Sequence, residues 1–358
     1  MYERQSQVKK GRGAVSNNDS RFEREARVLV DDGWDNGTEL PEAVRTVIAA
    51  DTARSIISRN ESPDVPFSQS VNPFRGCEHG CVYCFSRPTH AYLGLSPGLD
   101  FETKLFVKRG AAELLAKQLR AKNYVCEPLA LGANTDPYQP IERMEKITRA
   151  VLEVCRDFNQ PVGIITKSAL VTRDIDILAP MAKDGIARVA ISITTLDRDL
   201  ARRMEPRAST PGKRLEAVRT LAAAGIPVSV LASPMIPALN DHELEGILEA
   251  AHEAGAKGAS YIILRLPLEI GPLFAEWLQE HYPDRASRVL SLIKQMRDGA
   301  IYQSGFGTRM KGTGPYADLL RQRFQLTVRR LGLNNRSWEM DCSRFRTPPS
   351  QGDQLRLF

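Results

Sequence analysis

The sequence predicts an α/β fold built as an open, partial (β/α)6 barrel, with an arm before it and a helical or extended region after it. Short apolar or β-branched runs recur between residues 66 and 300, and longer segments with helical spacing separate them. Alternation of this kind builds a parallel sheet covered by helices. Six βα units suit an open barrel better than the closed eight-stranded one.

The first strand is expected just before Cys77. The other five are expected at residues 129–133, 162–166, 187–193, 228–232 and 260–264. Between them, IERMEKITRAVLEVCRDF (141–158) and GKRLEAVRTLAAAG (212–225) carry apolar residues at helical spacing, and a glycine closes the second segment.

The composition predicts four parts. Residues 1–60 are polar and are expected to form an extended, partly disordered arm. Residues 61–300 form the barrel, residues 301–350 a basic carboxyl-terminal extension, and residues 351–358 a tail peptide.

The composition also limits the class of protein. Hydrophobic content of 42% and charged content of 26% are those of a globular protein. No run of about 18 apolar residues predicts a membrane span, and the first residues, MYERQSQVKKGRG, lack the apolar segment of a secretory signal. We therefore expect no membrane contact and a cytoplasmic location. Thiols stay reduced there, which favours metal or redox chemistry over disulfides.

The net charge of +6 is unevenly distributed. Residues 309–358 hold ten Lys or Arg and four Asp or Glu (10 − 4 = +6), and residues 1–27 hold seven and four (7 − 4 = +3), which leaves −3 for the middle. Basic ends favour a polyanionic partner such as nucleic acid, although solvated surface charge explains them equally well.

Polar residues follow one predicted strand after another. The carboxyl ends of parallel strands meet at one edge, where such barrels place their active sites. That edge receives the segments around Cys77–Cys84, 134–138, 166–168, 192–194, 235–240 and Arg265, with Glu205 and Arg207 further along the chain. A purely structural barrel does not need so many polar strand ends.

Three cysteines stand together in NPFRGCEHGCVYC (72–84), at Cys77, Cys81 and Cys84. Thiolates bind soft metals and iron–sulfur clusters, and a four-iron cluster normally takes four of them. Three ligands leave one iron open to another molecule. A zinc site with His79 or His90 as fourth ligand is the competing interpretation. The isolated Cys155 lies in a helical pattern and is expected to be a buried apolar side chain.

The block CEHGCVYC resembles the signature of the radical SAM superfamily, with three cysteines spaced by three and two residues and an aromatic residue before the last. The wider NPFRGCEHGCVYCFSRPTHAYLGLSPGLDFETK resembles the branch related to spore photolyase, often labelled "DNA repair photolyase-like". TDPYQPIE, SITTLDRDLARRMEPR and GTRMKGTGPYADLLRQRF match that branch as well, so the resemblance runs from about residue 60 to 330. GRGAVSN near the amino terminus fits one of its subgroups.

The resemblance implies a [4Fe-4S] cluster held by Cys77, Cys81 and Cys84, with S-adenosylmethionine (SAM) on the fourth iron. One electron from a flavodoxin- or ferredoxin-type reductant would cleave SAM and release a 5′-deoxyadenosyl radical. The residues expected to contact SAM are Tyr83 and Ile236 near the adenine, Thr135 and Asp136 at the amino group, Ser192 and Thr194 at the ribose or carboxylate, and Arg207 at the carboxylate. Radical chemistry then belongs to the cofactor, and the protein positions the substrate and excludes water.

One departure from the branch concerns the hydrogen donor. Spore photolyase carries a cysteine just before its Ser/Thr-Asp pair, whereas this chain reads Ala133-Asn134-Thr135-Asp136. Cys126 is several residues earlier and is expected at the wrong end of the strand. Tyr138, Tyr92 and Tyr261 are candidate hydrogen relays, although a tyrosine near a cleft is more often packing. The substrate is open, with nucleic acid as one candidate. The alternatives to a radical enzyme are a zinc-stabilised nucleic-acid-binding module and an iron–sulfur electron-transfer or sensing protein.

The last residues form a separate motif. Gln354, Leu355, Leu357 and Phe358 resemble the Gln-Leu-x-Leu-Phe peptide with which bacterial polymerases and repair factors dock on the sliding clamp. The preceding TPPSQGD is typical of a flexible tether. We expect the tail either to bind a clamp as a short extended peptide or to fold back as a clip.

Overall fold

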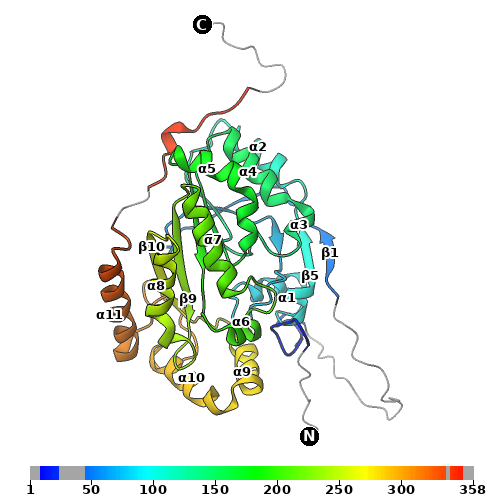
Figure 1. Ribbon diagram of the computed structural model, residues 1–358. Coiled ribbons are helices and arrows are strands. Elements are labelled where there is room, and N and C mark those ends of the chain that lie inside the picture. Colours follow the sequence, from blue (N-terminus) through cyan, green and yellow to red (C-terminus); the bar gives the residue numbers. More distant parts are fainter. Residues whose placement is uncertain (1–8, 24–44, 336–338, 350–358) are drawn as a thin grey trace.

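The computed structural model describes residues 9–23, 45–335 and 339–349, and a seven-stranded sheet forms its centre (Figure 1). The strand order is β10-β9-β8-β7-β6-β3-β2, and every pair except β2 and β3 is parallel. The bounds are β2 (Ile57–Arg59), β3 (Gln69–Val71), β6 (Leu129–Leu131), β7 (Val162–Thr166), β8 (Ala187–Ser192), β9 (Val228–Met235) and β10 (Gly258–Ile263). The six predicted parallel strands are confirmed.

The spatial order of the six parallel strands follows their order in the chain. Each crossover therefore steps to the next position in the same direction, and a twisted sheet built in this way curls toward a barrel. β10 and β2 stand at opposite ends of the strand order, so the barrel is open, as predicted.

Helices cover the outer face of the sheet (Figure 1). Their bounds are α1 (Leu99–Thr103), α2 (Ala111–Leu119), α3 (Glu142–Glu145), α4 (Ile147–Asp157), α5 (Ile175–Lys183), α6 (Arg198–Met204), α7 (Pro211–Ala223), α8 (Leu244–Glu253), α9 (Ile270–His281), α10 (Pro283–Gln295) and α11 (Gly314–Leu331). The predicted helix 141–158 is interrupted at Lys146, whose φ of 52° is incompatible with a continuous right-handed helix. The second predicted helix is α7, and Gly225 follows it with a φ of 78°.

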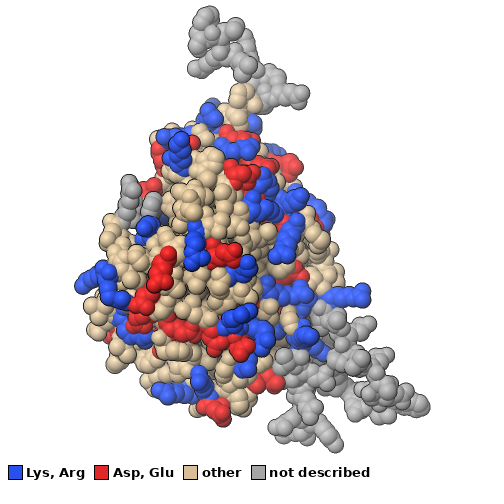
Figure 2. Space-filling model, in the orientation of Figure 1, with Lys and Arg blue, Asp and Glu red and all other residues tan. Residues whose placement is uncertain are grey.

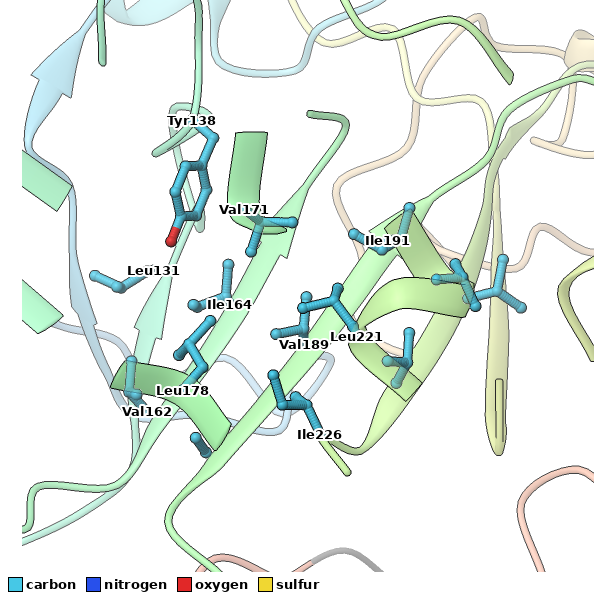
Figure 3. Packing of buried hydrophobic residues seen from close by; sticks show 14 of the residues in the cluster. Leu131, Tyr138, Val162, Ile164, Val171, Leu178, Val189, Ile191, Leu221 and Ile226 are labelled. Atoms are coloured by element: carbon cyan, nitrogen blue, oxygen red, sulfur yellow. The ribbon is translucent and has the colours of Figure 1, made fainter. Parts of the chain in front are cut away.

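The main core lies between the sheet and this helical layer (Figure 3). Ile164 of β7 and Val189 of β8 project toward Leu178 of α5 and Leu221 of α7, and all four side chains are buried. Burying each of these side chains contributes about 1.5–3 kcal/mol, so packing of the apolar helical faces holds the layer on the sheet.

A second apolar cluster lies at the other end of the barrel, where α9 and α10 cover the edge. Trp277 of α9 is fully buried in it and donates a hydrogen bond to the Arg203 carbonyl at 3.1 Å. Val82 and Tyr83 belong to the same cluster. The cysteine segment is therefore seated on a packed apolar floor.

A small sheet stands beside the barrel, with the order β1 (Val47–Ala50), β5 (Lys104–Val107) and β4 (Phe74–Arg75). The sequence predicts residues 1–60 only as an extended arm, whereas β1 and β2 pair as edge strands of the two sheets. Sheet edges offer unpaired backbone groups, and an extended segment nearby satisfies them. The division of the chain into four parts stays a prediction.

The basic carboxyl-terminal region contains α11, which packs along α8 (Figure 1). Arg323 forms an ion pair with Glu245 at 2.5 Å, and Arg330 pairs with Glu249, both acidic partners lying on α8. On the face shown in Figure 2, basic and acidic side chains are interspersed. Much of the positive charge expected to meet a polyanion is thus matched within the chain. Of the described helices, none has the length and apolar character needed to cross a membrane.

Candidate active site

The three cysteines lie in a tight loop that follows β4 at the carboxyl edge of the barrel. Cys77 and Cys81 are buried, and Cys84 is partly exposed. Gly76 (φ 76°) begins the loop and Gly80 (φ 68°) turns it. A Cβ at position 76 would lie 2.8 Å from Leu105 Cδ2 and 2.9 Å from the Phe101 carbonyl oxygen, so only glycine fits there.

The thiols affect one another. Burial raises the pKa of Cys77 well above its usual value, and Asp136, Cys81 and Cys84 raise it further. Burial and the nearby Glu205 likewise raise the pKa of Cys81, against the opposing charge of Lys167. Neutral thiols are therefore favoured until a positively charged group enters the loop.

A single-ion site does not appear among the described side chains, since no three His, Cys, Asp or Glu residues converge tightly enough to hold one metal ion. The two histidines considered as zinc ligands have other partners. His79 Nδ1 lies 3.3 Å from Asp136 Oδ2, and His90 Nε2 lies 2.9 Å from the Lys104 carbonyl oxygen. In a cluster, each thiolate binds a different iron, so convergence on one point is not required.

Asp136 connects the end of β7 with the cysteine loop. Its carboxylate accepts hydrogen bonds from Thr166 Oγ1 at 2.7 Å and from the Lys167 amide at 2.8 Å, and it faces His79. Burial alone would raise the pKa of Asp136, but His79 and these hydrogen bonds lower that pKa to about 2. The group is a carboxylate at neutral pH, and it fixes the position of the His79 ring between Cys77 and Cys81.

Tyr83 is held by a buried polar network. Its hydroxyl donates to Glu205, which also accepts from Thr194 Oγ1 at 2.6 Å and pairs with Arg214. Arg214 additionally donates to the Ser192 carbonyl oxygen at 3.0 Å, so the network ties the end of β8 to the cysteine loop. Since the hydroxyl is already engaged, only the ring of Tyr83 remains available for a ligand.

The other residues expected around SAM also meet at this edge of the sheet. Thr135 is buried and donates to the Phe74 carbonyl oxygen at 3.1 Å, while Ser192 Oγ donates to the Ser233 carbonyl oxygen at 3.1 Å. Ile236 is fully buried. These three side chains therefore shape the backbone of the site.

Arg207, for which the resemblance implies a ligand carboxylate as partner, pairs in the structure with Glu78 of the cysteine loop at 2.7 Å. Its backbone amide donates to the His79 carbonyl oxygen at 3.2 Å. The Arg207 side chain is 39% exposed, which leaves part of its guanidinium open.

Two charged residues of the site had no role assigned from the sequence. Lys167 follows β7 and places Nζ 5.7 Å from the centre of the Tyr83 ring. Glu205 organises the buried network described above. Both stand just beyond buried segments at the carboxyl edge, and a charged residue in such a position is the signal that identifies them.

The candidate hydrogen relays face away from the loop. Tyr138 is buried and donates to Asp174 Oδ2 at 3.0 Å, and Figure 3 shows it among the core residues. Tyr261 packs on Phe324 of α11, on the outer side of the sheet, and Tyr92 is 71% exposed beside Phe22. Packing therefore explains all three tyrosines.

The isolated cysteines lie where the sequence predicts them. Cys126 precedes β6, at the end of that strand opposite to Asp136, and its thiol lies 3.6 Å from Gln160 Oε1. Cys155 of α4 is fully buried in the main core.

The sequence matches the family described as the radical SAM superfamily over residues 71–251, which spans half of the chain and contains the whole cysteine loop. This chain belongs to the radical SAM superfamily. It is a radical SAM enzyme, and the cofactors of that superfamily are a [4Fe-4S] cluster and SAM. The alternative of a binding or electron-transfer module without radical chemistry is therefore set aside.

Relatives support the same assignment. An uncharacterized protein of Mycobacterium tuberculosis is 34% identical over 278 residues, which cover 74% of this chain and 82% of that protein. An uncharacterized protein of Methanocaldococcus jannaschii is 28% identical over 60% of this chain and 76% of its own length.

Among solved structures, a spore photoproduct lyase mutant gives a TM-score of 0.56 at 16% identity, with 80% of each chain covered. Spore photoproduct lyase complexed with dinucleoside spore photoproduct gives 0.56 at 15% identity with the same coverage. This likeness is one of fold, and it fits the spore-photolyase-related branch that the sequence motifs indicate.

Proposed function

We propose that Cys77, Cys81 and Cys84 bind three irons of a [4Fe-4S] cluster and leave the fourth iron for SAM. The observation that carries the proposal is the loop itself, in which three mutually interacting thiols, buried or partly buried, lie at the carboxyl edge of a radical SAM barrel. Gly76 and Gly80 keep the loop compact, and the donor set of three thiols matches a cluster with one open iron.

The cleft for SAM is proposed from the neighbouring side chains. Lys167 and Arg207 supply positive charge for the carboxylate of SAM, and Asp136 supplies negative charge near its amino group. Tyr83 and Ile236 supply apolar contact for the adenine. Thr135, Ser192 and Thr194 bond to the protein's own backbone, so their part is to shape the ends of their strands. When bound, the cluster and SAM supply a 5′-deoxyadenosyl radical after one-electron reduction. The chain's own residues orient the ligand and exclude water.

Replacement of single cysteines tests this proposal. Cys77→Ala, Cys81→Ala and Cys84→Ala should each abolish the intact cluster, measured as iron content and electron paramagnetic resonance of anaerobically prepared protein. Cys126→Ala, Cys155→Ala and Cys342→Ala are the matched controls and should keep it. Addition of SAM should change the spectrum of the reduced wild type. An unchanged spectrum, or zinc in place of iron, would refute the proposal.

The substrate we propose is related to nucleic acid. Phe85, directly after Cys84, is 49% exposed, and Arg265 at the end of β10 places its guanidinium carbon 5.7 Å from the Phe85 ring. That guanidinium contacts Met310 Sδ and Tyr302 Oη, both of them neutral groups, at 3.4 Å. An exposed ring beside an arginine suits a stacked base and its phosphate. The neighbour complexed with dinucleoside spore photoproduct supports the same class.

Binding of a single-stranded oligonucleotide tests the substrate class. Affinity should fall steeply with salt, and Phe85→Ala and Arg265→Met should weaken it while Arg321→Met on α11 leaves it unchanged. No binding at low salt would exclude a nucleic-acid substrate of this kind. Dimer repair of the spore-photolyase type is not proposed, because Ala133 and Asn134 stand where that enzyme has its thiol.

Two further proposals concern partners. A flavodoxin- or ferredoxin-type protein in the cytoplasm is the proposed electron donor, since radical SAM chemistry needs one-electron reduction. The clamp-binding peptide of Gln354, Leu355, Leu357 and Phe358 lies outside the described residues and stays a proposal. Titration of the carboxyl-terminal decapeptide against purified sliding clamp tests it, with Leu357→Ala and Phe358→Ala as the variants that should lose binding.

A further inference from the structure

Residues 9–23, here called the arm, pass directly over the outer side of the cysteine loop. Gly13 makes the closest approach. A Cβ at position 13 would lie 1.7 Å from the Gly80 carbonyl oxygen and 3.3 Å from the Val82 amide nitrogen. The arm therefore touches the peptides on both sides of Cys81, and no side chain fits at position 13.

The carboxylate of Glu102 joins the arm to the loop. One oxygen accepts from the Gly13 amide at 2.9 Å and the other from the Ala14 amide at 2.8 Å. The same carboxylate forms an ion pair with Arg87 at 2.5 Å, and Arg87 Nε donates to the Cys81 carbonyl oxygen at 2.9 Å. Glu102 and Arg87 are both fully buried.

Burial makes this connection cooperative. A buried carboxylate is stable only when its oxygens are paired, and the arm supplies two of the hydrogen bonds that Glu102 accepts. Displacement of the arm would leave Glu102 with Arg87 alone and would expose the turn at Gly80. A change at the arm is thus transmitted to the backbone of Cys81 through two buried charged groups.

Further contacts hold the arm along its length. Ser16 Oγ donates to Glu276 of α9 at 2.5 Å, and the Ser16 carbonyl oxygen accepts from the Leu99 amide at 3.3 Å. Asn17 Oδ1 accepts from the Asp100 amide at 2.8 Å. Ala14 and Val15 are buried between these anchors. In Figure 1 the arm, in dark blue, lies beside α1, α6 and α9.

We infer that the arm is a clamp that holds the Cys77–Cys84 loop in its cluster-binding shape and shields the loop's outer side from water. Glu102 is the positioning residue of this clamp, and it acts on the loop through Arg87 and through the arm's own backbone. The inference rests on the proposed binding of the cluster by these three cysteines. It assigns a role to GRGAVSN (11–17), a motif that the catalytic function itself does not explain.

The test compares Gly13→Ala with Gly212→Ala, since a Cβ at position 212 of α7 would have nothing within 4 Å and the helical backbone there accepts alanine. Iron release to an excess of chelator, followed in anaerobic protein, should be at least several-fold faster in Gly13→Ala and unchanged in Gly212→Ala. Hydrogen exchange, measured in cluster-free protein, should rise together in residues 9–16 and 77–84 of Gly13→Ala. Glu102→Gln, which keeps the shape of the side chain, should give the same pattern.

Exchange that rises only in residues 9–16, with iron release as in the wild type, would overturn the inference. A Gly13→Ala protein that fails to fold leaves Glu102→Gln to decide between the same outcomes. Wild-type protein that binds no cluster would refute the proposed function instead. Even then the exchange measurement still decides whether the arm holds the loop, so the two failures are distinguishable.

Discussion

Asp64 and Arg309 form an ion pair that joins the two edges of the open barrel. Asp64 lies between β2 and β3 at one end of the sheet, and its carboxylate also accepts from the Gly307 amide at 2.7 Å. Met310, next to Arg309, accepts a backbone hydrogen bond from Ile263 of β10 at 2.9 Å, at the other end of the sheet. The segment 305–312 therefore closes the seam that the strands leave open.

Loss of this pair should loosen the seam. Asp64→Ala removes the acceptor of both Arg309 and Gly307, so hydrogen exchange in residues 305–312 should increase and the melting temperature should fall. Glu61→Ala, in the same connection and exposed, is the matched control and should change neither. Equal exchange in both variants would show that the seam is held by the backbone bonds of β10 alone.

The buried pair Glu205–Arg214 should contribute strongly to stability. Arg214→Met leaves Glu205 buried without its cation, and breaking a buried pair in this way costs about 3–5 kcal/mol. Urea unfolding of the variant measures the loss in free energy of unfolding. Glu216→Gln breaks the exposed pair with Lys213 on α7 and should have no measurable effect. A small loss in Arg214→Met would mean that Tyr83 and Thr194 suffice for Glu205.

Lys167 should contribute to SAM binding. Lys167→Met removes the cation beside Tyr83, and we expect affinity for SAM to fall about tenfold or more, equivalent to about 1.4 kcal/mol, with iron content unchanged. Calorimetric titration of the anaerobic protein with SAM measures it. Arg207→Ala should also lower affinity, although its pairing with Glu78 makes the loop part of the response. Wild-type affinity in both variants would show that the ligand's carboxylate binds elsewhere.

The stability of the protein should change with pH in a window set by Lys311. Burial lowers the pKa of Lys311 to about 8 from 10.5, and its ammonium donates to the Tyr261 carbonyl oxygen at 2.5 Å. Between about pH 8 and 10.5 the unfolded chain binds this proton and the folded chain does not, so raising the pH favours the folded state. Wild-type melting temperature should gain on that of Lys311→Met across this window. A constant difference between the two would contradict the shift, and Lys122→Met is the exposed control.

Local features made much of the fold predictable. Six strands follow from short apolar runs at residues such as 162–166 and 187–193, because alternation with helical segments leaves few arrangements of the chain. The break at Lys146 was missed, since the apolar spacing continues across it and only the backbone reveals the left-handed turn. The strands β1 and β2 were missed for a related reason, because an extended polar segment becomes a strand only when a sheet edge lies beside it.

The candidate site divides in the same way. Cys77, Cys81 and Cys84 are close in sequence, so their spacing alone brings three thiols into one loop. Arg207 was placed correctly at the edge of the sheet, yet its partner Glu78 lies 129 residues away and no pattern in the chain connects the two. Lys167 and Glu205 stood at predicted strand ends without an assigned role, because the sequence shows a charge but not the direction in which it points.

The sequence by itself determined the order of strands, the edge that bears the site and the three thiols that define its chemistry. Only the tertiary structure decided which distant groups meet there: Gly13 against Gly80, Glu102 between the arm and Arg87, and Asp64 across the seam from Arg309. The physical reason is the range of the interactions. Periodicity and thiol spacing act within a few residues. A buried carboxylate, in contrast, takes whichever donors the packed chain brings within hydrogen-bonding distance.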